Sequence, residues 1–246
     1  MSFTVRRLKS QWFQVVRRLK YGLPHKANKP GTARWLAAKE QAYGGYHRNV
    51  PRHKVGRSLD GSAVPTGGMI GGDRMGSDLQ QHAYGPFYEK MMHSFIGRPI
   101  TLVEVGILRG VGLAIWSDLF PNGKIVGLDL DPSHFHGNVQ KLRERGAFSS
   151  NNVSVYEFDQ VEHGSDNLEK IFEKSSIDVV IDDGMHTRHA IKNTFESMRP
   201  FLKKDYLYIV EDSHDAVDVL PFNRTLHRVI QQGEICAVFP RRQRPD

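Results

Sequence analysis

Two stretches of the chain differ in their pattern of apolar and polar positions. From Val5 to Leu19 apolar residues recur every three or four positions between basic residues, which predicts a basic amphipathic helix. Such a helix either packs on its own domain or a second subunit, or lies on an anionic membrane surface. Residues 22–72 are rich in Gly, Pro, His, Lys and Arg without clear periodicity, and indicate an extended arm or cap.

After His82 the pattern becomes a regular alternation of strands and helices. The predicted strands cover residues 100–105, 124–130, 153–158, 177–181, 206–210 and 235–239. The predicted helices cover residues 87–95, 112–119, 138–145, 167–174 and 188–202. Short apolar strands separated by helices predict an α/β fold with a doubly wound, mostly parallel sheet. We therefore divide the chain into a basic N-terminal helix and arm, residues 1–72, and an α/β domain, residues 73–246.

Charge is distributed unevenly along the 246 residues. The total is +7, but residues 1–60 hold 14 Lys and Arg against two acids, so the remaining residues carry a net −5. An acidic body argues against a broad nucleic-acid-binding face, and we expect no specific nucleic-acid partner. Cys236 is the only cysteine, and no apolar run approaches the roughly 20 residues that span a bilayer. We expect a soluble cytoplasmic protein, and leave membrane contact through residues 5–20 open.

A glycine-rich turn follows the first predicted strand of the α/β domain. Gly106 and Gly110 would let the backbone approach a ligand at the carboxyl end of this strand. The spacing departs from G-x-G-x-x-G, which disfavours a pyrophosphate cradle. Glu104, just before the turn, would repel a pyrophosphate but suits the cationic amino and sulfonium groups of S-adenosylmethionine (SAM). The alternative is an ordinary turn that needs glycine at positive φ.

Polar residues at the ends of the next two predicted strands fit the same cofactor. Asp129 closes the second strand, where a carboxylate can accept hydrogen bonds from ribose hydroxyls. Asp159 and Gln160 follow the third strand, where an adenine edge would lie. A helix N-cap explains Asp159 equally well.

Acid pairs end the fourth and fifth predicted strands. Asp183 follows the fourth, and Glu211 and Asp212 follow the fifth, so parallel pairing would bring these carboxylates together. Three crowded carboxylates repel one another unless a cation neutralises them, and Mg²⁺ suits their oxygens, with Mn²⁺ or Ca²⁺ as substitutes. His186 lies near enough to act as general base toward a hydroxyl.

A simpler interpretation of these acids remains open. Asp182 and Asp183 would cap the helix that starts near Arg188, and Glu211 and Asp212 would be solvated loop acids. Two acidic pairs that close consecutive apolar strands, with a histidine beside one of them, favour the metal site.

The motifs together resemble a known family. The segments that carry the resemblance are residues 72–78, 82–84, 87–88, 103–106, 129, 181–186 and 210–212. They are similar to the metal-dependent sugar O-methyltransferases of antibiotic pathways, the mycinamicin and macrocin O-methyltransferase group, and to the related cephalosporin hydroxylase-like proteins. The resemblance covers roughly residues 70–215, and the Asp-Asp-Gly-x-His and Glu-Asp pairs are its most specific part.

The resemblance carries expectations about fold and site. It implies a class I methyltransferase (Rossmann-like) fold, SAM as donor, and homo-oligomers whose N-terminal segments shape neighbouring sites. Mg²⁺ would be bound by Asp183, Glu211 and Asp212, and His186 would be the base, so that His186 and Asp183 are the catalytic pair. Asp73, Tyr84 and Asp182 would lie beside the cofactor.

Three departures from the family pattern stand out. Arg74 replaces a frequent Lys, and Met185 replaces a usual Ser, which removes a hydroxyl near the metal. The sequence ends soon after the predicted strand 235–239, whereas this fold finishes with a sixth and a reversed seventh strand. We therefore expect the last strand to be missing or supplied differently.

The expected function is SAM-dependent, Mg²⁺-assisted O-methylation. The acceptor would be a hydroxyl of a sugar, a glycosylated small molecule or a glycolipid. One alternative is a catechol- or small-phenol-type O-methyltransferase, and another is a non-catalytic binding subunit on a methyltransferase fold.

Overall fold

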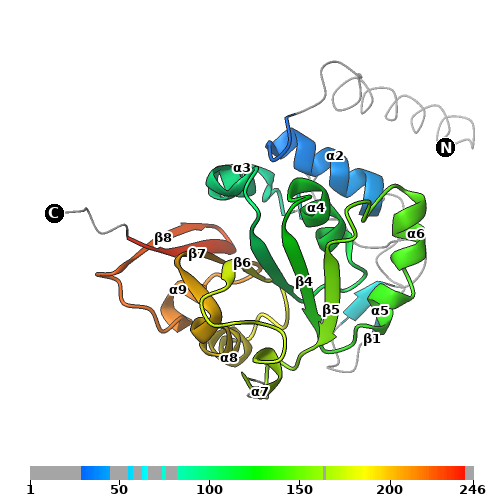
Figure 1. The fold of residues 1–246 in the computed structure, drawn as a ribbon. Helices are drawn as coiled ribbons and strands as arrows, with labels where there is room; N and C mark the ends of the chain where they lie inside the picture. The colour runs from blue at the N-terminus through cyan, green and yellow to red at the C-terminus, as the bar shows by residue number, and fades with distance from the viewer. Residues whose placement is uncertain are drawn as a thin grey trace, which may run out of the picture.

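The computed structural model describes residues 29–44, 55–57, 63–65, 74–75, 82–162 and 165–241 (Figure 1). The predicted helix at residues 5–19, most of the predicted arm, and Asp73 lie outside the described residues. Among the helices that are described, none has the length and apolar character needed to cross a bilayer.

The chain forms short helices around one large sheet. The helices are α2 (Ala33–Gly44), α3 (Gly85–Met92), α4 (Val111–Leu119), α5 (Ser133–His136), α6 (Val139–Glu144), α7 (Ser165–Leu168), α8 (Arg188–Met198) and α9 (Ala216–Val219), with 3-10 turns η1 (His93–Phe95) and η2 (Arg199–Phe201). The strands are β1 (Val55–Arg57), β2 (Ala63–Pro65), β3 (Thr101–Val105), β4 (Lys124–Asp129), β5 (Val153–Glu157), β6 (Ile177–Asp182), β7 (Leu202–Val210), β8 (His227–Gln232) and β9 (Ile235–Pro240).

Seven of the strands form the sheet, in the order β5-β4-β3-β6-β7-β9-β8. Strands β3 to β7 pair in parallel, and β9 runs antiparallel to both of its neighbours. The predicted doubly wound, mostly parallel sheet is confirmed. Several predicted bounds change. The helix expected over 167–174 ends at Leu168, the helix expected over 188–202 ends at Met198, and the strand expected from Tyr206 already begins at Leu202.

The expectation of a missing last strand was wrong. Strand β8 is the sixth strand of the fold, and β9 inserts between β7 and β8 as the reversed seventh. Residues His227–Gln232 escaped prediction because β8 is an edge strand whose side chains are only half-buried or exposed, so its apolar pattern is weak.

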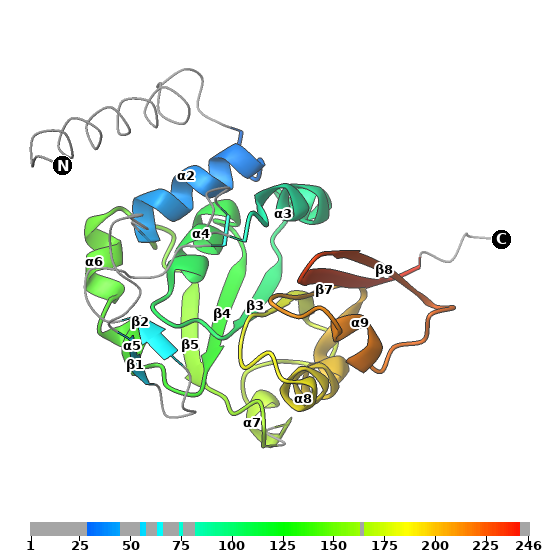
Figure 2. The same ribbon diagram turned by 180° about the vertical axis from the view of Figure 1, so that it is seen from behind.

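Helices cover both faces of the sheet, as the two opposite views in Figures 1 and 2 show. On one face, α2, α3 and α4 enclose a core that includes Tyr88 and Trp116. On the other face, α8 and α9 pack over a second core that includes Phe195 and Tyr208. The carboxyl ends of β3, β6 and β7 therefore meet at an edge that is bordered by both layers.

Helix α2 belongs to the first of these layers although no helix was predicted there. Its buried positions Leu36, Glu40 and Tyr43 follow helical spacing, and Leu36 and Tyr43 are part of the core with α3 and α4. A glutamate in the middle of the buried face weakens the hydrophobic periodicity that sequence analysis relies on. A buried glutamate such as Glu40 requires hydrogen-bond partners inside the protein.

Candidate active site

The glycine-rich turn between β3 and α4 touches the loop that follows β6. Gly106 has φ +83°, and a Cβ added there would lie 2.1 Å from the carbonyl oxygen of Asp183. Gly110 has φ +80°, and a Cβ there would lie 2.4 Å from Phe135. Both glycines are thus required by neighbouring groups of the protein itself, which agrees with the simpler interpretation of the turn. Their contact with a cofactor stays a prediction.

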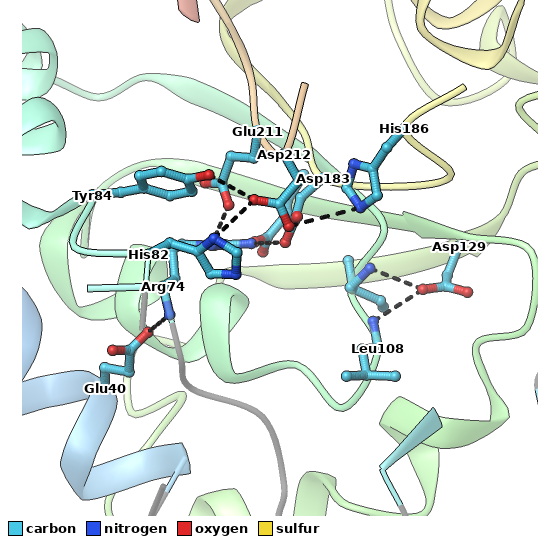
Figure 3. A network of polar contacts seen from close by, with 12 residues as sticks. Glu40, Arg74, His82, Tyr84, Leu108, Asp129, Asp183, His186, Glu211 and Asp212 are labelled. Carbon is cyan, nitrogen blue, oxygen red and sulfur yellow. Dashed lines mark hydrogen bonds and ion pairs between the residues drawn. The ribbon is translucent and has the colours of Figure 1, made fainter. Parts of the chain in front are cut away.

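Asp129 connects this turn to the end of β4. Its Oδ2 accepts hydrogen bonds from the backbone N–H groups of Ile107 and Leu108, at 2.8 and 3.0 Å, and its Oδ1 accepts from Asp131 at 3.0 Å (Figure 3). The residue is half-buried, and Oδ1, which accepts only the bond from Asp131 among these three, can accept a second hydrogen bond. Asp129 therefore shapes the turn while it remains able to bind a ribose.

The other predicted cofactor residues bind groups of the protein. Asp159 accepts from the backbone N–H of Val161 at 2.7 Å, as expected for a turn-capping side chain. Gln160 donates to Asp182 Oδ1 at 2.8 Å and accepts from the N–H of Met185 at 2.7 Å, and both Gln160 and Asp182 are buried on the α8 side of the sheet. Their contact with a cofactor stays a prediction.

Parallel pairing of β6 with β3 and β7 gathers the predicted acids. The N–H of Asp183 donates to Val105 O at 2.8 Å, and the N–H of Glu211 donates to Asp182 O at 2.9 Å, so the ladders continue to the first residue after each strand. Asp183, Glu211 and Asp212 thereby meet at one edge (Figure 3).

Arg74 reaches into these acids from outside the sheet. Its Nη1 lies 2.6 Å from Glu104 Oε1 and its Nε lies 2.9 Å from Glu211 Oε2, while Nη2 donates to Asp183 Oδ2. The second oxygen of Glu211 accepts from the hydroxyl of Tyr88. We call Arg74, Tyr88, Glu104 and Glu211 the inner cluster. Sequence analysis treated Arg74 only as a departure from the family pattern, and so missed its part in the site.

Glu40 of α2 fixes the backbone that carries this arginine. Its Oε1 accepts from the N–H of Arg74 at 2.9 Å and its Oε2 accepts from the N–H of Met75 at 2.8 Å. Glu40 is 2% exposed, so both bonds are shielded from water. A carboxylate that binds two consecutive N–H groups determines where the following guanidinium can lie.

Burial dominates the electrostatics of the inner cluster. It raises the pKa of Glu211 well above its usual range and raises the pKa of Glu104 and Asp183, against the opposing effect of Arg74. Burial disfavours the charged guanidinium, but Glu211, Asp183 and Glu104 together raise the pKa of Arg74 well above its ordinary value. One guanidinium cannot balance three carboxylates when all of them are ionised, and uncompensated negative charge would then lie on the side of Asp183 that faces away from Arg74.

The outer cluster, which we define as Asp183, His186 and Asp212, lies on that side. One potential ligand atom from each residue lies within 4.8 Å of the others, and the His186 Nε2 to Asp212 Oδ2 distance is 4.0 Å. The His186 and Asp212 side chains are 33% and 29% exposed. Glu211 is not in this group, because Arg74 and Tyr88 engage its oxygens. Its predicted role as a metal ligand would require one of them to give way.

Two residues of the segment before α3, His82 and Tyr84, contact Asp212 from the opposite side. The hydroxyl of Tyr84 donates to Asp212 Oδ1 at 2.6 Å, and His82 Nδ1 lies 3.3 Å from the same oxygen. Tyr84 was predicted to lie beside a cofactor, and in the structure its polar contact is with this acid. The spacing His82-Ala83-Tyr84 was the available signal.

Left-handed backbone is concentrated around the outer cluster. Four of the seven non-glycine residues with positive φ in the described part of the chain are Ala83, Leu108, His186 and Asp212. Such conformations cost free energy and are retained where the surrounding structure enforces them, often at functional sites. The loops thus aim His186 and Asp212 in directions that relaxed loops would rarely provide.

Comparison with known proteins identifies the family of this fold. A family profile described as "Methyltransferase domain" matches residues 103–231, which is more than half of the chain. The chain belongs to this methyltransferase family. The resemblance inferred from the motifs is confirmed, and the matched segment contains the glycine-rich turn and both acid pairs.

Curated relatives of this methyltransferase are named as O-methyltransferases. It is 27% identical over 140 residues to mycinamicin VI 2''-O-methyltransferase of Micromonospora griseorubida, covering 53% of this chain and 31% of the relative. It is 32% identical over 166 residues to the 8-demethyl-8-alpha-L-rhamnosyl tetracenomycin-C 2'-O-methyltransferase of Streptomyces olivaceus, covering 63% of this chain and 39% of the relative. The chain thus spans only 31% and 39% of the length of these two relatives.

A solved structure supports the methyltransferase fold. MycE methyltransferase from the mycinamycin biosynthetic pathway, determined in complex with Mg and SAH, superposes with a TM-score of 0.51 at 19% identity, covering 67% of this chain and 51% of that chain. At this identity the match concerns the fold alone.

Proposed function

We propose that this methyltransferase transfers a methyl group from SAM to a hydroxyl group, with a sugar hydroxyl as the preferred acceptor. The observation that carries the proposal is the outer cluster, which places a partly exposed histidine beside two carboxylates at the carboxyl edge of a methyltransferase sheet. The names of the curated relatives, which methylate sugar hydroxyls, support the acceptor class.

His186 is the proposed general base. A neutral imidazole accepts a proton from an alcohol while the alcohol oxygen bonds to the methyl carbon. The sulfur–carbon bond of the donor breaks in the same step, S-adenosylhomocysteine (SAH) leaves, and the proton passes from His186 to solvent. Asp212, 4.0 Å from the ring, favours the protonated imidazole that this step creates.

The donor would lie across the turn between β3 and α4. Asp129 keeps acceptor capacity for a ribose hydroxyl on Oδ1, and the carboxylate of Glu104 is buried at the end of β3. A carboxylate at the end of the first strand suits a cationic donor, although Arg74 already pairs with its Oε1.

A divalent cation fits the outer cluster by the chemistry of its donor set. Asp183 and Asp212 would hold it as oxygen ligands, His186 lies within reach, and the negative charge left by Arg74 is on this side. Such an ion would supply positive charge that lowers the pKa of a nearby hydroxyl. We therefore propose Asp183 and Asp212 as its ligands and retain the predicted Glu211 only as a residue that supports them.

Methyl-transfer assays test this function. Purified protein, SAM and Mg²⁺ would be incubated with matched panels of glycosides and catechols, and SAH formation would be measured. We expect turnover on glycosides and a loss of about 100-fold or more in His186→Ala, the size of a general-base contribution. His189→Ala is the matched control, because His189 contacts Asn193 of its own helix. Turnover on catechols alone would contradict the proposed sugar acceptor. Unchanged turnover in His186→Ala would contradict the role of His186 as general base.

A further inference from the structure

The inner cluster supplies its own cation. Glu104 and Glu211 are 1% and 2% exposed, and both pair with the guanidinium of Arg74, whose side chain is 12% exposed. Buried carboxylates at the ends of neighbouring strands repel each other unless positive charge lies between them. In this chain the guanidinium lies in that position.

The geometry uses the fork shape of the arginine. Nη1 contacts Glu104 at 2.6 Å, Nε contacts Glu211 at 2.9 Å, and Nη2 donates to Asp183, so three donors of one planar group reach acids from three different strand ends. A lysine ammonium is a point charge on a flexible stem and cannot match three separated acceptors in this way. The arginine therefore joins the ends of β3, β6 and β7.

Space for this group is provided by a glycine of α4. A Cβ added to Gly112 would lie 2.1 Å from Glu104 Oε1 and 2.7 Å from Arg74 Nη1. Because Gly112 has no side chain, the first turn of α4 leaves space for the ion pair between Arg74 and Glu104. A larger residue at position 112 would disturb both the ion pair and the packing of α4.

The arginine is brought in by a segment distant in sequence. Glu40 on α2 accepts from the N–H groups of Arg74 and Met75, and Met75 is 3% exposed. Because α2 packs on α3 and α4, this contact ties the position of Arg74 to the helical layer (Figures 1 and 3). Glu40 thus acts on the acids through the backbone of Arg74.

We propose that Arg74 is the resident cation that assembles the inner acid cluster without a divalent metal, and that Glu40 of α2 is its positioning residue. The inner cluster then holds the carboxyl ends of β3, β6 and β7 together without a metal ion. An added ion would bind only Asp183 and Asp212, which lie outside the inner cluster. The proposal goes beyond the proposed function and does not depend on methyl transfer or on the acceptor.

The test measures thermal unfolding in EDTA, where divalent ions are removed. Arg74→Met is expected to lower Tm by about 10 °C, because it leaves buried carboxylates unpaired in a chain of this size. Glu211→Gln alone is expected to lower Tm, yet in the Arg74→Met background it should restore at least half of the loss, since it removes the unpaired charge. An Arg74→Met protein as stable as the parent in EDTA, or a double variant without recovery, would overturn the proposal.

Arg74→Lys covers the case in which Arg74→Met does not fold. Arg74→Lys keeps the positive charge but loses the planar guanidinium, and we expect its Tm to lie between that of the parent and that of Arg74→Met. A parental Tm for Arg74→Lys would contradict the bridging role.

Substitution of two carboxylates that accept from backbone N–H groups, Glu40 and Glu89, tests whether Glu40 positions Arg74 or only stabilises the packing of α2. Glu40→Gln loosens the backbone of Arg74, so we expect the Tm penalty of Arg74→Met to shrink by half or more in that background. Glu89→Gln is the matched control, since Glu89 Oε2 accepts from the N–H of Ala33 at 2.8 Å, at the start of α2, and not from the N–H of Arg74. The penalty should stay intact there. Equal penalties in both backgrounds would exclude the positioning role of Glu40.

Discussion

The inner and outer clusters solve the same electrostatic problem in different ways. In the inner cluster, a buried guanidinium and a tyrosine hydroxyl engage both oxygens of Glu211. In the outer cluster, Asp212 is 29% exposed and faces the imidazoles of His82 and His186. The inner cluster is therefore closed and structural, whereas the outer cluster keeps acceptor capacity for a ligand or ion.

Asp183 connects the two clusters. Its Oδ2 accepts from Arg74, and its carboxylate also faces His186 and Asp212. A reactive edge must present carboxylates in a defined direction, and an acid held on one side by a buried arginine is preorganised for this. The closed cluster thus serves the open one by fixing the acid that they share.

The largest effect is expected from a change that disturbs both clusters at once. Gly106→Ala would place a methyl group 2.1 Å from the carbonyl oxygen of Asp183 at φ +83°. The clash is with backbone, so we expect a loss of more than about 3 kcal/mol in unfolding free energy. Gly146→Ala is the control for backbone strain, because Gly146 has φ +90° with nothing within 4 Å, and about 1 kcal/mol is expected. Equal losses in urea unfolding would contradict the close contact between the two loops.

A pair of tyrosines compares the clusters directly. Tyr88→Phe removes the hydroxyl that donates to Glu211. The Glu211 oxygen left without this donor is buried and cannot bind water instead, so we expect a loss of about 2 to 3 kcal/mol in unfolding free energy. Tyr84→Phe removes the donor to Asp212, which water can replace at this partly exposed site, and we expect about 1 kcal/mol. Chemical denaturation of both variants measures the difference. A Tyr84→Phe loss as large as that of Tyr88→Phe would remove the distinction between a closed and an open cluster.

Sequence patterns predicted the parts of the fold that rest on continuous apolar burial. All six residues of β6 are buried, and β3 is buried from its second residue, so both strands were clear in the sequence. Strand β8 and helix α2 were not, because one is a half-exposed edge strand and the other carries Glu40 on its buried face. Periodicity detects apolar faces and fails where tertiary contacts bury a polar group.

The site was predictable to a similar extent. Acids at the ends of neighbouring parallel strands had to converge, and the need for positive charge between them followed from repulsion. The source of that charge could not be inferred, because Arg74 lies 109 positions from Asp183 in sequence and reaches it through the contact with Glu40. Local patterns carry no information about such a pairing.

A third buried acid shows what happens without a guanidinium. Asp182 is 1% exposed, its polar contacts are with Gln160 and the hydroxyl of Tyr208, and burial raises its pKa to about 7. A folded-state pKa above the ordinary 3.8 means that the folded protein holds a proton that the unfolded chain releases. The stability of the parent should therefore fall as the pH rises from about 4 to about 7.

Asp182→Asn removes this ionisation while it keeps the size of the side chain and an amide able to bind Gln160 and Tyr208. We expect the difference in unfolding free energy between variant and parent to move in favour of the variant by about 2 kcal/mol between pH 5.5 and pH 8.5, from the shift of about three pKa units. Denaturant titrations at both pH values measure this change, and titrations common to both proteins cancel. A difference that stays constant with pH would mean that Asp182 also has a cationic partner when folded, and the contrast with the arginine-held Glu211 would no longer hold.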